Sequence, residues 1–121
     1  MLSDTLTNIE ALLKQLSLMN DSVLSDFISL LSHYKVGMWL YPGVVKRRLN
    51  LPIKEVYSVL NVLEHNGYIE SYYELCCFGC QKTNGLVRTI NEMPQTFTCE
   101  ICEKELVAIE NSVLIYRVNQ E

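Results

Sequence analysis

The first apolar residues of the chain recur in alternating steps of four and three, which is the spacing of one helix face. They are Leu2, Leu6, Ile9, Leu13 and Leu16. The pattern predicts an amphipathic helix over residues 1–20. Its apolar stripe is expected either to pack on the protein's own core or to bind a protein partner or a second copy of the chain.

A second helix is expected next, because Asp21 and Ser22 are good N-cap residues and Gly37 can end a helix. Apolar residues between these positions again fall on one helix face. They are Leu24, Phe27, Ile28, Leu31 and Tyr34. The short apolar stretch of residues 38–41 then predicts a strand.

Proline, asparagine and glycine divide the following segment into two helices. Pro42 suits the first turn of a short helix reaching Leu49, and Asn50 predicts a turn. Pro52 starts a longer helix, which Asn66 and Gly67 end. Residues 68–76, which alternate and contain no breaker, predict a strand.

Four of the five cysteines form two Cys-x-x-Cys pairs with 18 residues between them. The pairs are Cys77 with Cys80 and Cys99 with Cys102. Two intervening residues let both thiolates of a tight turn face one ion, so this spacing predicts a four-cysteine Zn²⁺ site. Four protein ligands leave no open position for water, and the zinc is therefore expected to be structural.

Three alternatives to zinc are redox pairs, disulfides and iron–sulfur ligation. A redox pair would require a Cys-x-x-Cys that opens a helix in a thioredoxin-like βαβ pattern, which the chain does not show. An odd number of cysteines argues against a disulfide framework. Cys76 also leaves the identity of the first ligand open, although equal spacing in the two pairs favours Cys77 and would leave Cys76 as a core thiol.

The remaining pattern predicts short strands. Asn84-Gly85 predicts a hairpin turn over residues 82–85. Strands are expected at residues 86–90, 96–98 and 113–118, and the last of these places Leu114, Tyr116 and Val118 on one face. Helices followed by short strands predict an α+β fold.

The order helix, strand, helix, turn, helix, strand resembles a winged helix-turn-helix domain. Residues 42–49 are similar to the positioning helix and residues 52–60 to the recognition helix of that family. Residues 63–69, Leu-Glu-His-Asn-Gly-Tyr-Ile, are similar to the segment that leads into the wing. The resemblance covers residues 21–76.

The resemblance implies that the recognition helix enters the major groove of DNA while neighbouring residues hold phosphates. On this interpretation the nucleic-acid-binding residues include the one dense basic cluster of the chain and exposed positions of the second helix. They are Lys46, Arg47, Arg48, Lys54, Ser58 and Asn61. The alternative for the basic cluster is a solvated helix face.

We expect an N-terminal helix at residues 1–20, a winged helix-turn-helix at 21–76 with the final strand 113–118, and a zinc ribbon at 77–112. One arrangement inserts the ribbon into the wing. The other places it beyond a completed domain, which resembles the alpha subunits of archaeal and eukaryotic general transcription factor E.

Charge qualifies the DNA hypothesis. The formal net charge is −4, and it divides into −2 for residues 1–35, +1 for 36–70 and −3 for 71–121. DNA affinity depends strongly on phosphate neutralisation. Two functions therefore stand: a transcription regulator, or a non-catalytic adaptor that is similar to kite subunits of SMC-type ATPases or to middle components of bacterial defence systems.

Catalysis and membrane insertion are not expected. The histidines, His33 and His65, have no acidic or nucleophilic partner at a meaningful spacing, and no Gly-rich phosphate loop is present, so neither an enzyme nor a small-molecule substrate is expected. No apolar run spans a bilayer and no secretory signal is found. We expect a cytoplasmic or nucleoid-associated protein.

Overall fold

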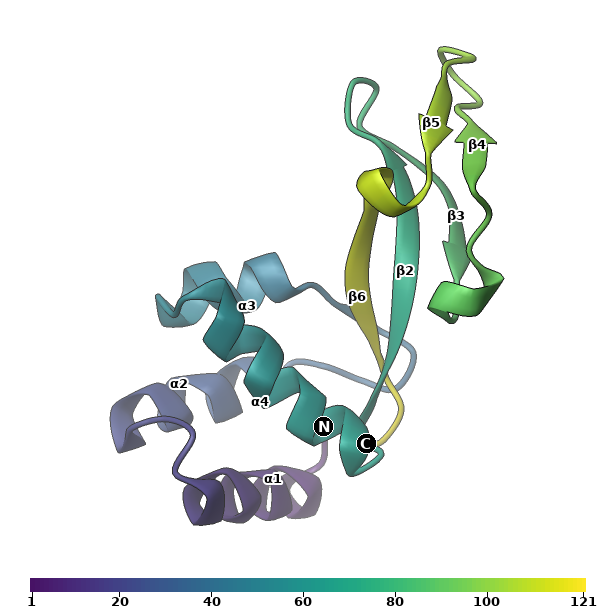
Figure 1. The fold of residues 1–121 in the computed structure, drawn as a ribbon. Coiled ribbons are helices and arrows are strands. Elements are labelled where there is room, and N and C mark those ends of the chain that lie inside the picture. Colours follow the sequence, from purple (N-terminus) through teal and green to yellow (C-terminus); the bar gives the residue numbers. More distant parts are fainter. The chain divides into compact units, whose positions relative to one another are not determined.

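Four helices precede the first long strand, in the order that the apolar spacing predicts (Figure 1). The computed structural model describes residues 1–121. The helices are α1 (Ser3–Leu16), α2 (Asp21–Leu31), α3 (Pro42–Leu49) and α4 (Ile53–His65). Together with antiparallel strands they confirm the expected α+β class.

The start of α2 lies one residue earlier than the sequence pattern indicates. Asp21 and Ser22 are the first residues of the helix, and Asn20 is the N-cap, whose side-chain oxygen accepts a hydrogen bond from the Val23 N–H at 2.8 Å. Asparagine caps a helix as well as aspartate or serine does. The residue types alone therefore do not determine which of these three consecutive polar residues is the N-cap. The expectation that Asp21 or Ser22 is the cap is therefore wrong.

A tight turn joins α3 to α4. Asn50 adopts the left-handed conformation with φ of 53°, and α4 begins two residues after Leu51, directly behind Pro52. Asparagine tolerates this conformation better than most residues with a side chain. The turn sets the two helices against each other, and they are in contact along their packed faces.

The strands form two sheets. Four neighbouring strands, in the order β1, β6, β2, β3, make the larger sheet, and β4 and β5 pair only with each other. The bounds of the strands are β1 (Trp39–Leu40), β2 (Ile69–Cys77), β3 (Lys82–Val87), β4 (Thr96–Thr98), β5 (Glu105–Val107) and β6 (Ser112–Val118). Short 3₁₀ turns, η1 (Ile90–Glu92) and η2 (Ile109–Asn111), flank the smaller sheet in sequence.

The predicted hairpin turn at residues 82–85 is wrong, because Asn84 and Gly85 lie inside β3. The turn between β2 and β3 is made by residues 78–81, and Gln81 supplies the left-handed residue with φ of 53°. The register between the strands shifts beyond Glu74, where β3 has one residue more than β2. Asn84-Gly85 therefore forms a β-bulge. The conformational freedom that makes Asn-Gly common in turns also suits it to a bulge.

The chain divides into two compact units, which we describe separately. The helical unit comprises Met1–Glu70 and Tyr116–Glu121, and the cysteine unit comprises Ser71–Ile115. In the helical unit, α1 contacts α2, α2 contacts α3 and α3 contacts α4. Most of the buried apolar side chains of the protein belong to this unit. The division into domains at 1–20, 21–76 and 77–112 stays a prediction.

Candidate metal centre

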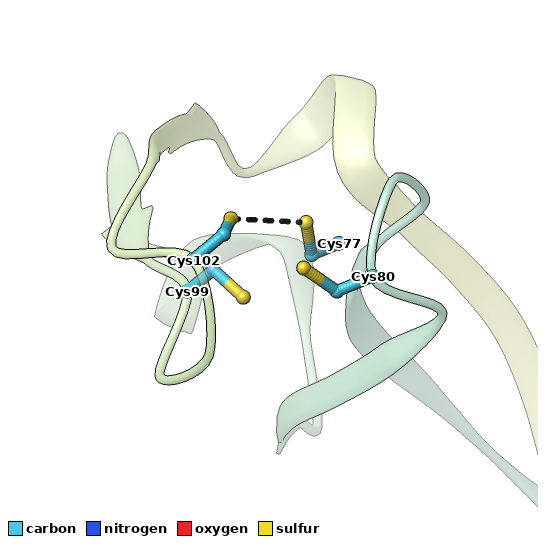
Figure 2. A group of neighbouring side chains, drawn as sticks. All are labelled: Cys77, Cys80, Cys99 and Cys102. Carbon is cyan, nitrogen blue, oxygen red and sulfur yellow. Dashed lines mark hydrogen bonds between the residues drawn. The ribbon is translucent and has the colours of Figure 1, made fainter.

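Two turns of the cysteine unit bring four cysteines together (Figure 2). Cys77 is the last residue of β2 and Cys80 lies in the turn that follows it. Cys99 directly follows β4, and Cys102 lies in the turn before β5. Each pair comes from its own loop, and the sulfurs of the two loops point toward one another (Figure 2).

The four sulfur atoms are close enough to share one ion. All lie within 4.8 Å of one another, and the Sγ atoms of Cys77 and Cys102 are 3.8 Å apart. A disulfide requires about 2.05 Å between the sulfurs, and no cysteine of the chain forms one. The cluster could therefore hold a metal ion, as the spacing of the cysteines predicts.

Backbone hydrogen bonds fix the second turn around Cys99. The Cys99 N–H donates to the Lys104 carbonyl at 3.0 Å, and the Glu103 N–H donates to the Cys99 carbonyl at 2.9 Å. The Ile101 N–H points at the Cys99 sulfur at 3.4 Å, which disperses negative charge on a thiolate. These hydrogen bonds fix the position of the Cys99 sulfur within its own turn.

One residue that the sequence pattern assigned to a turn connects the two cysteine loops. The Asn84 side-chain oxygen accepts a hydrogen bond from the Glu100 N–H at 3.0 Å. Asn84 lies in the bulge of β3, the strand that follows the first cysteine pair, and Glu100 follows Cys99 of the second pair. The hydrogen bond therefore joins β3 to the loop of the second pair. No sequence signal distinguishes this role from that of an ordinary Asn-Gly turn.

The thiols of the cluster differ in acidity. Hydrogen bonds from the backbone N–H groups of Cys102 and Ile101 lower the pKa of Cys99 to about 6. Hydrogen bonding to Cys102, followed by desolvation, raises the pKa of Cys80 to about 12. A bound cation would favour the thiolate form of both cysteines.

Cys76 lies outside the cluster. Its sulfur is 3.4 Å from a carboxylate oxygen of Glu74 and 3.6 Å from the carbonyl oxygen of the same residue. Burial and the neighbouring Glu74 raise the pKa of the Cys76 thiol to about 11. Cys77 and not Cys76 is therefore the candidate ligand, because the Cys76 sulfur contacts Glu74 while the Cys77 sulfur lies within the cluster.

The residues expected to bind DNA are all exposed on α3 and α4. Lys46, Arg47 and Arg48 occupy the last turn of α3. The other three lie within α4 at spacings of four and three residues, which places them on one side of that helix. They are Lys54, Ser58 and Asn61. The Ser58 hydroxyl donates to the Lys54 carbonyl at 3.0 Å.

The apolar stripe of α1 is divided between core and surface. Ile9 and Leu13 are fully buried in the helical unit, and Leu6 is partly buried. Leu2 and Leu16, at the two ends of the stripe, are 62% and 48% exposed. A partner of α1 would reach these ends and not the centre of the stripe.

No other group of His, Cys, Asp or Glu side chains is arranged to hold a metal ion. His33 and His65 are exposed and lie outside the cysteine cluster. None of the helices combines the length and the apolar character that a membrane span requires.

Comparison of the chain with protein-family models, with curated proteins and with solved structures found no match.

Proposed function

We propose that the protein is a winged helix-turn-helix protein with a zinc ribbon and that it binds DNA as a transcription regulator. The observation that carries this proposal is the exposure of three consecutive basic residues, Lys46 to Arg48, at the end of α3. A tight turn leads from them to α4, whose exposed side carries Lys54, Ser58 and Asn61. In this arrangement α4 enters the major groove and α3 contacts phosphates.

The metal of the cysteine cluster is proposed to be Zn²⁺. Four sulfurs at about 2.3 Å from a central zinc ion lie about 3.8 Å apart in a tetrahedron, and Cys77 and Cys102 are separated by 3.8 Å. Cys77, Cys80, Cys99 and Cys102 would supply all four ligands. Such a closed site holds its loops together and has no position for a reacting water.

The cysteine unit needs a metal because its apolar core is small. Only five of its apolar residues are buried, and two of these are the candidate ligands Cys77 and Cys99. The other three are Leu75, Ala108 and Ile115. A core of this size does not offset the conformational entropy of the chain, whereas a structural zinc ion contributes roughly 10 kcal/mol or more at neutral pH.

The expected DNA binding is salt-sensitive and modest. The whole chain carries a net charge of −4, so attraction to DNA depends on the local basic surface of α3 and α4. If each of the three basic residues of α3 neutralises one phosphate, they account for about 2.7 units of the slope of log affinity against log salt.

The experiment is a salt titration of binding to a labelled DNA duplex. Replacing Lys46, Arg47 and Arg48 by Ala should weaken binding and reduce the salt slope by up to about 2.7 units. The matched control replaces three exposed lysines elsewhere, Lys35, Lys82 and Lys104, by Ala and changes the net charge equally. No binding by the unaltered protein at low salt, or equal loss in both variants, would contradict the proposal.

A second candidate is a non-catalytic adaptor subunit, similar to a kite subunit of an SMC-type ATPase or a middle component of a bacterial defence system. It is favoured by the net acidity of the chain and by the exposed ends of the α1 stripe, Leu2 and Leu16. Co-purification with an ATPase that survives nuclease treatment, and that is lost when Leu2 and Leu16 are replaced by Ser, would support it. A protein recovered only together with DNA would favour the regulator.

A further inference from the structure

An apolar hollow of about 460 Å³ lies within the cysteine unit, apart from the four cysteines. Its lining residues come from η1, from the chain leading into β4, from β4 and β5, and from η2. Its main lining residues are Ile90, Met93, Pro94, Thr96, Val107 and Ile109. Neither the metal centre nor the basic surface of α3 uses any of them.

The side chains around the hollow are unusually exposed for their type. Ile90 is 49% exposed, Val107 44% and Ile109 63%. These apolar residues surround one cavity and are not scattered singly over the surface. A concave group of exposed apolar side chains is typical of a binding site for another molecule.

The charge around the hollow is negative. Residues 89–112 contain five glutamates and a single basic residue, Lys104. Glu92 ends η1, Glu110 follows Ile109 in η2, and Glu105 lies two residues before Val107 and so on the same face of β5. All three glutamates are exposed. Such a surface repels nucleic acid phosphates and anionic lipids and attracts lysine and arginine.

The smaller sheet also has an unpaired edge beside the hollow. β4 pairs with β5 alone, and hydrogen bonds join Ala108 to the Gln95 carbonyl and Cys99 to the Lys104 carbonyl, each at 3.0 Å. Because hydrogen-bonded pairs alternate in an antiparallel ladder, the backbone groups of Thr96 and Thr98 point away from β5. Thr96 itself lines the hollow.

We propose that this hollow binds an extended segment of a partner protein in which lysine or arginine stands two positions from an apolar residue. The segment pairs with the outer edge of β4 through Thr96 and Thr98. Alternate residues of a strand face opposite sides of a sheet, so an apolar side chain beside Thr96 and a basic side chain beside Thr98 share the face that carries Val107 and Glu105. The exposed carboxylates of Glu92 and Glu110 attract further basic side chains. Strand addition supplies affinity through the backbone, and alternate side chains supply specificity. This site operates whether or not α3 and α4 bind DNA.

The test is a selection from a displayed library of random short peptides on the full-length, zinc-loaded protein. Enriched sequences should carry lysine or arginine two positions from an apolar residue and should bind less tightly as salt rises. Ile109→Lys should weaken the enriched peptide about tenfold or more, since an exposed side chain can be changed without disturbing the core. Glu110→Lys should also weaken it.

The matched control is Leu86→Lys, which alters a 48% exposed residue of the same unit outside the hollow and should leave binding unchanged. Four results would overturn the proposal. Three are no enrichment, enrichment of acidic sequences, and an equal effect of Leu86→Lys and Ile109→Lys. The fourth, measured by sedimentation, is self-association that Ile109→Lys abolishes, because it would assign the hollow to a second copy of the chain.

Discussion

At the scale of single residues, the metal centre depends on which of two adjacent cysteines faces the cluster. Cys77 lies 3.8 Å from Cys102, whereas Cys76 contacts Glu74. We expect Cys77→Ser to remove the metal and to unfold the cysteine unit, because three thiolates and a hydroxyl bind zinc far more weakly than four thiolates. Metal content and thermal unfolding of the purified variant measure this.

The neighbouring variant, Cys76→Ser, is the control for that substitution. It removes a thiol one position away and should retain one metal ion per chain and nearly the original unfolding temperature. Loss of the metal in Cys76→Ser, with retention in Cys77→Ser, would reverse the assignment of the ligands.

The acidity of the thiols predicts how zinc affinity changes with pH. Cys80, whose pKa is raised to about 12 by hydrogen bonding to Cys102, must release a proton when the metal binds. Affinity should therefore rise with pH, about tenfold per pH unit for each proton displaced. Below the pKa of Cys99, about 6, the Cys99 thiol must also release its proton, and the dependence should steepen.

Competition with a chelator at a series of pH values measures this dependence. The Cys76→Ser variant should show the same dependence, because Cys76 is not a ligand. An affinity that is unchanged with pH would contradict the proton release.

At the scale of elements, the turn between α3 and α4 sets the orientation of the basic end of α3 relative to α4. Asn50 has a φ of 53°, which β-branched residues avoid. Asn50→Val should lower the free energy of unfolding by roughly 1–2 kcal/mol, whereas Asn50→Gly should change it by less than this. Chemical denaturation of both variants measures the difference, and equal stability of the two would show that the turn conformation carries little energy.

The helices could be predicted from the sequence because each has a regular apolar face bounded by proline, asparagine or glycine. The ends of α3 and α4 agree with the positions of Pro42, Pro52 and Asn66 to within a few residues. Between the cysteine pairs the pattern is weaker, and Asn84-Gly85 there forms a bulge and not the expected hairpin turn. The predicted turn at residues 82–85 does not form, because residues 78–81 already reverse the chain.

The candidate ligands could be predicted because two residues between paired cysteines let both sulfurs face one ion. The contact of Asn84 with Glu100 could not, since it joins positions 16 residues apart that only the folded loops bring together. The burial of Ile9 and Leu13 could not be predicted either, because an apolar helix face does not show which element or partner covers it.

At the scale of the whole molecule, the two units differ in what stabilises them. The helical unit has an apolar core that includes Phe27, Leu60 and Tyr116, all fully buried. The cysteine unit buries only a few apolar side chains and gathers four thiols instead. Hydrophobic packing therefore stabilises the first unit, and we propose that metal coordination stabilises the second.

Charge follows the same division. Arg47 and its basic neighbours lie in the helical unit, while the cysteine unit has six acidic residues against three basic ones. Four thiolates with one Zn²⁺ would add two more negative charges to the cysteine unit. We therefore expect the helical unit to contact DNA and the cysteine unit to contact a basic protein segment.

The most direct test is elemental analysis of the full-length protein purified without added metal. The account predicts zinc at close to one ion per chain, with the ion lost in the Cys77→Ser variant and kept in Cys76→Ser. Protein that contains no transition metal, and whose unfolding temperature does not change with added zinc or chelator, would contradict the claim that thiolate coordination stabilises the cysteine unit.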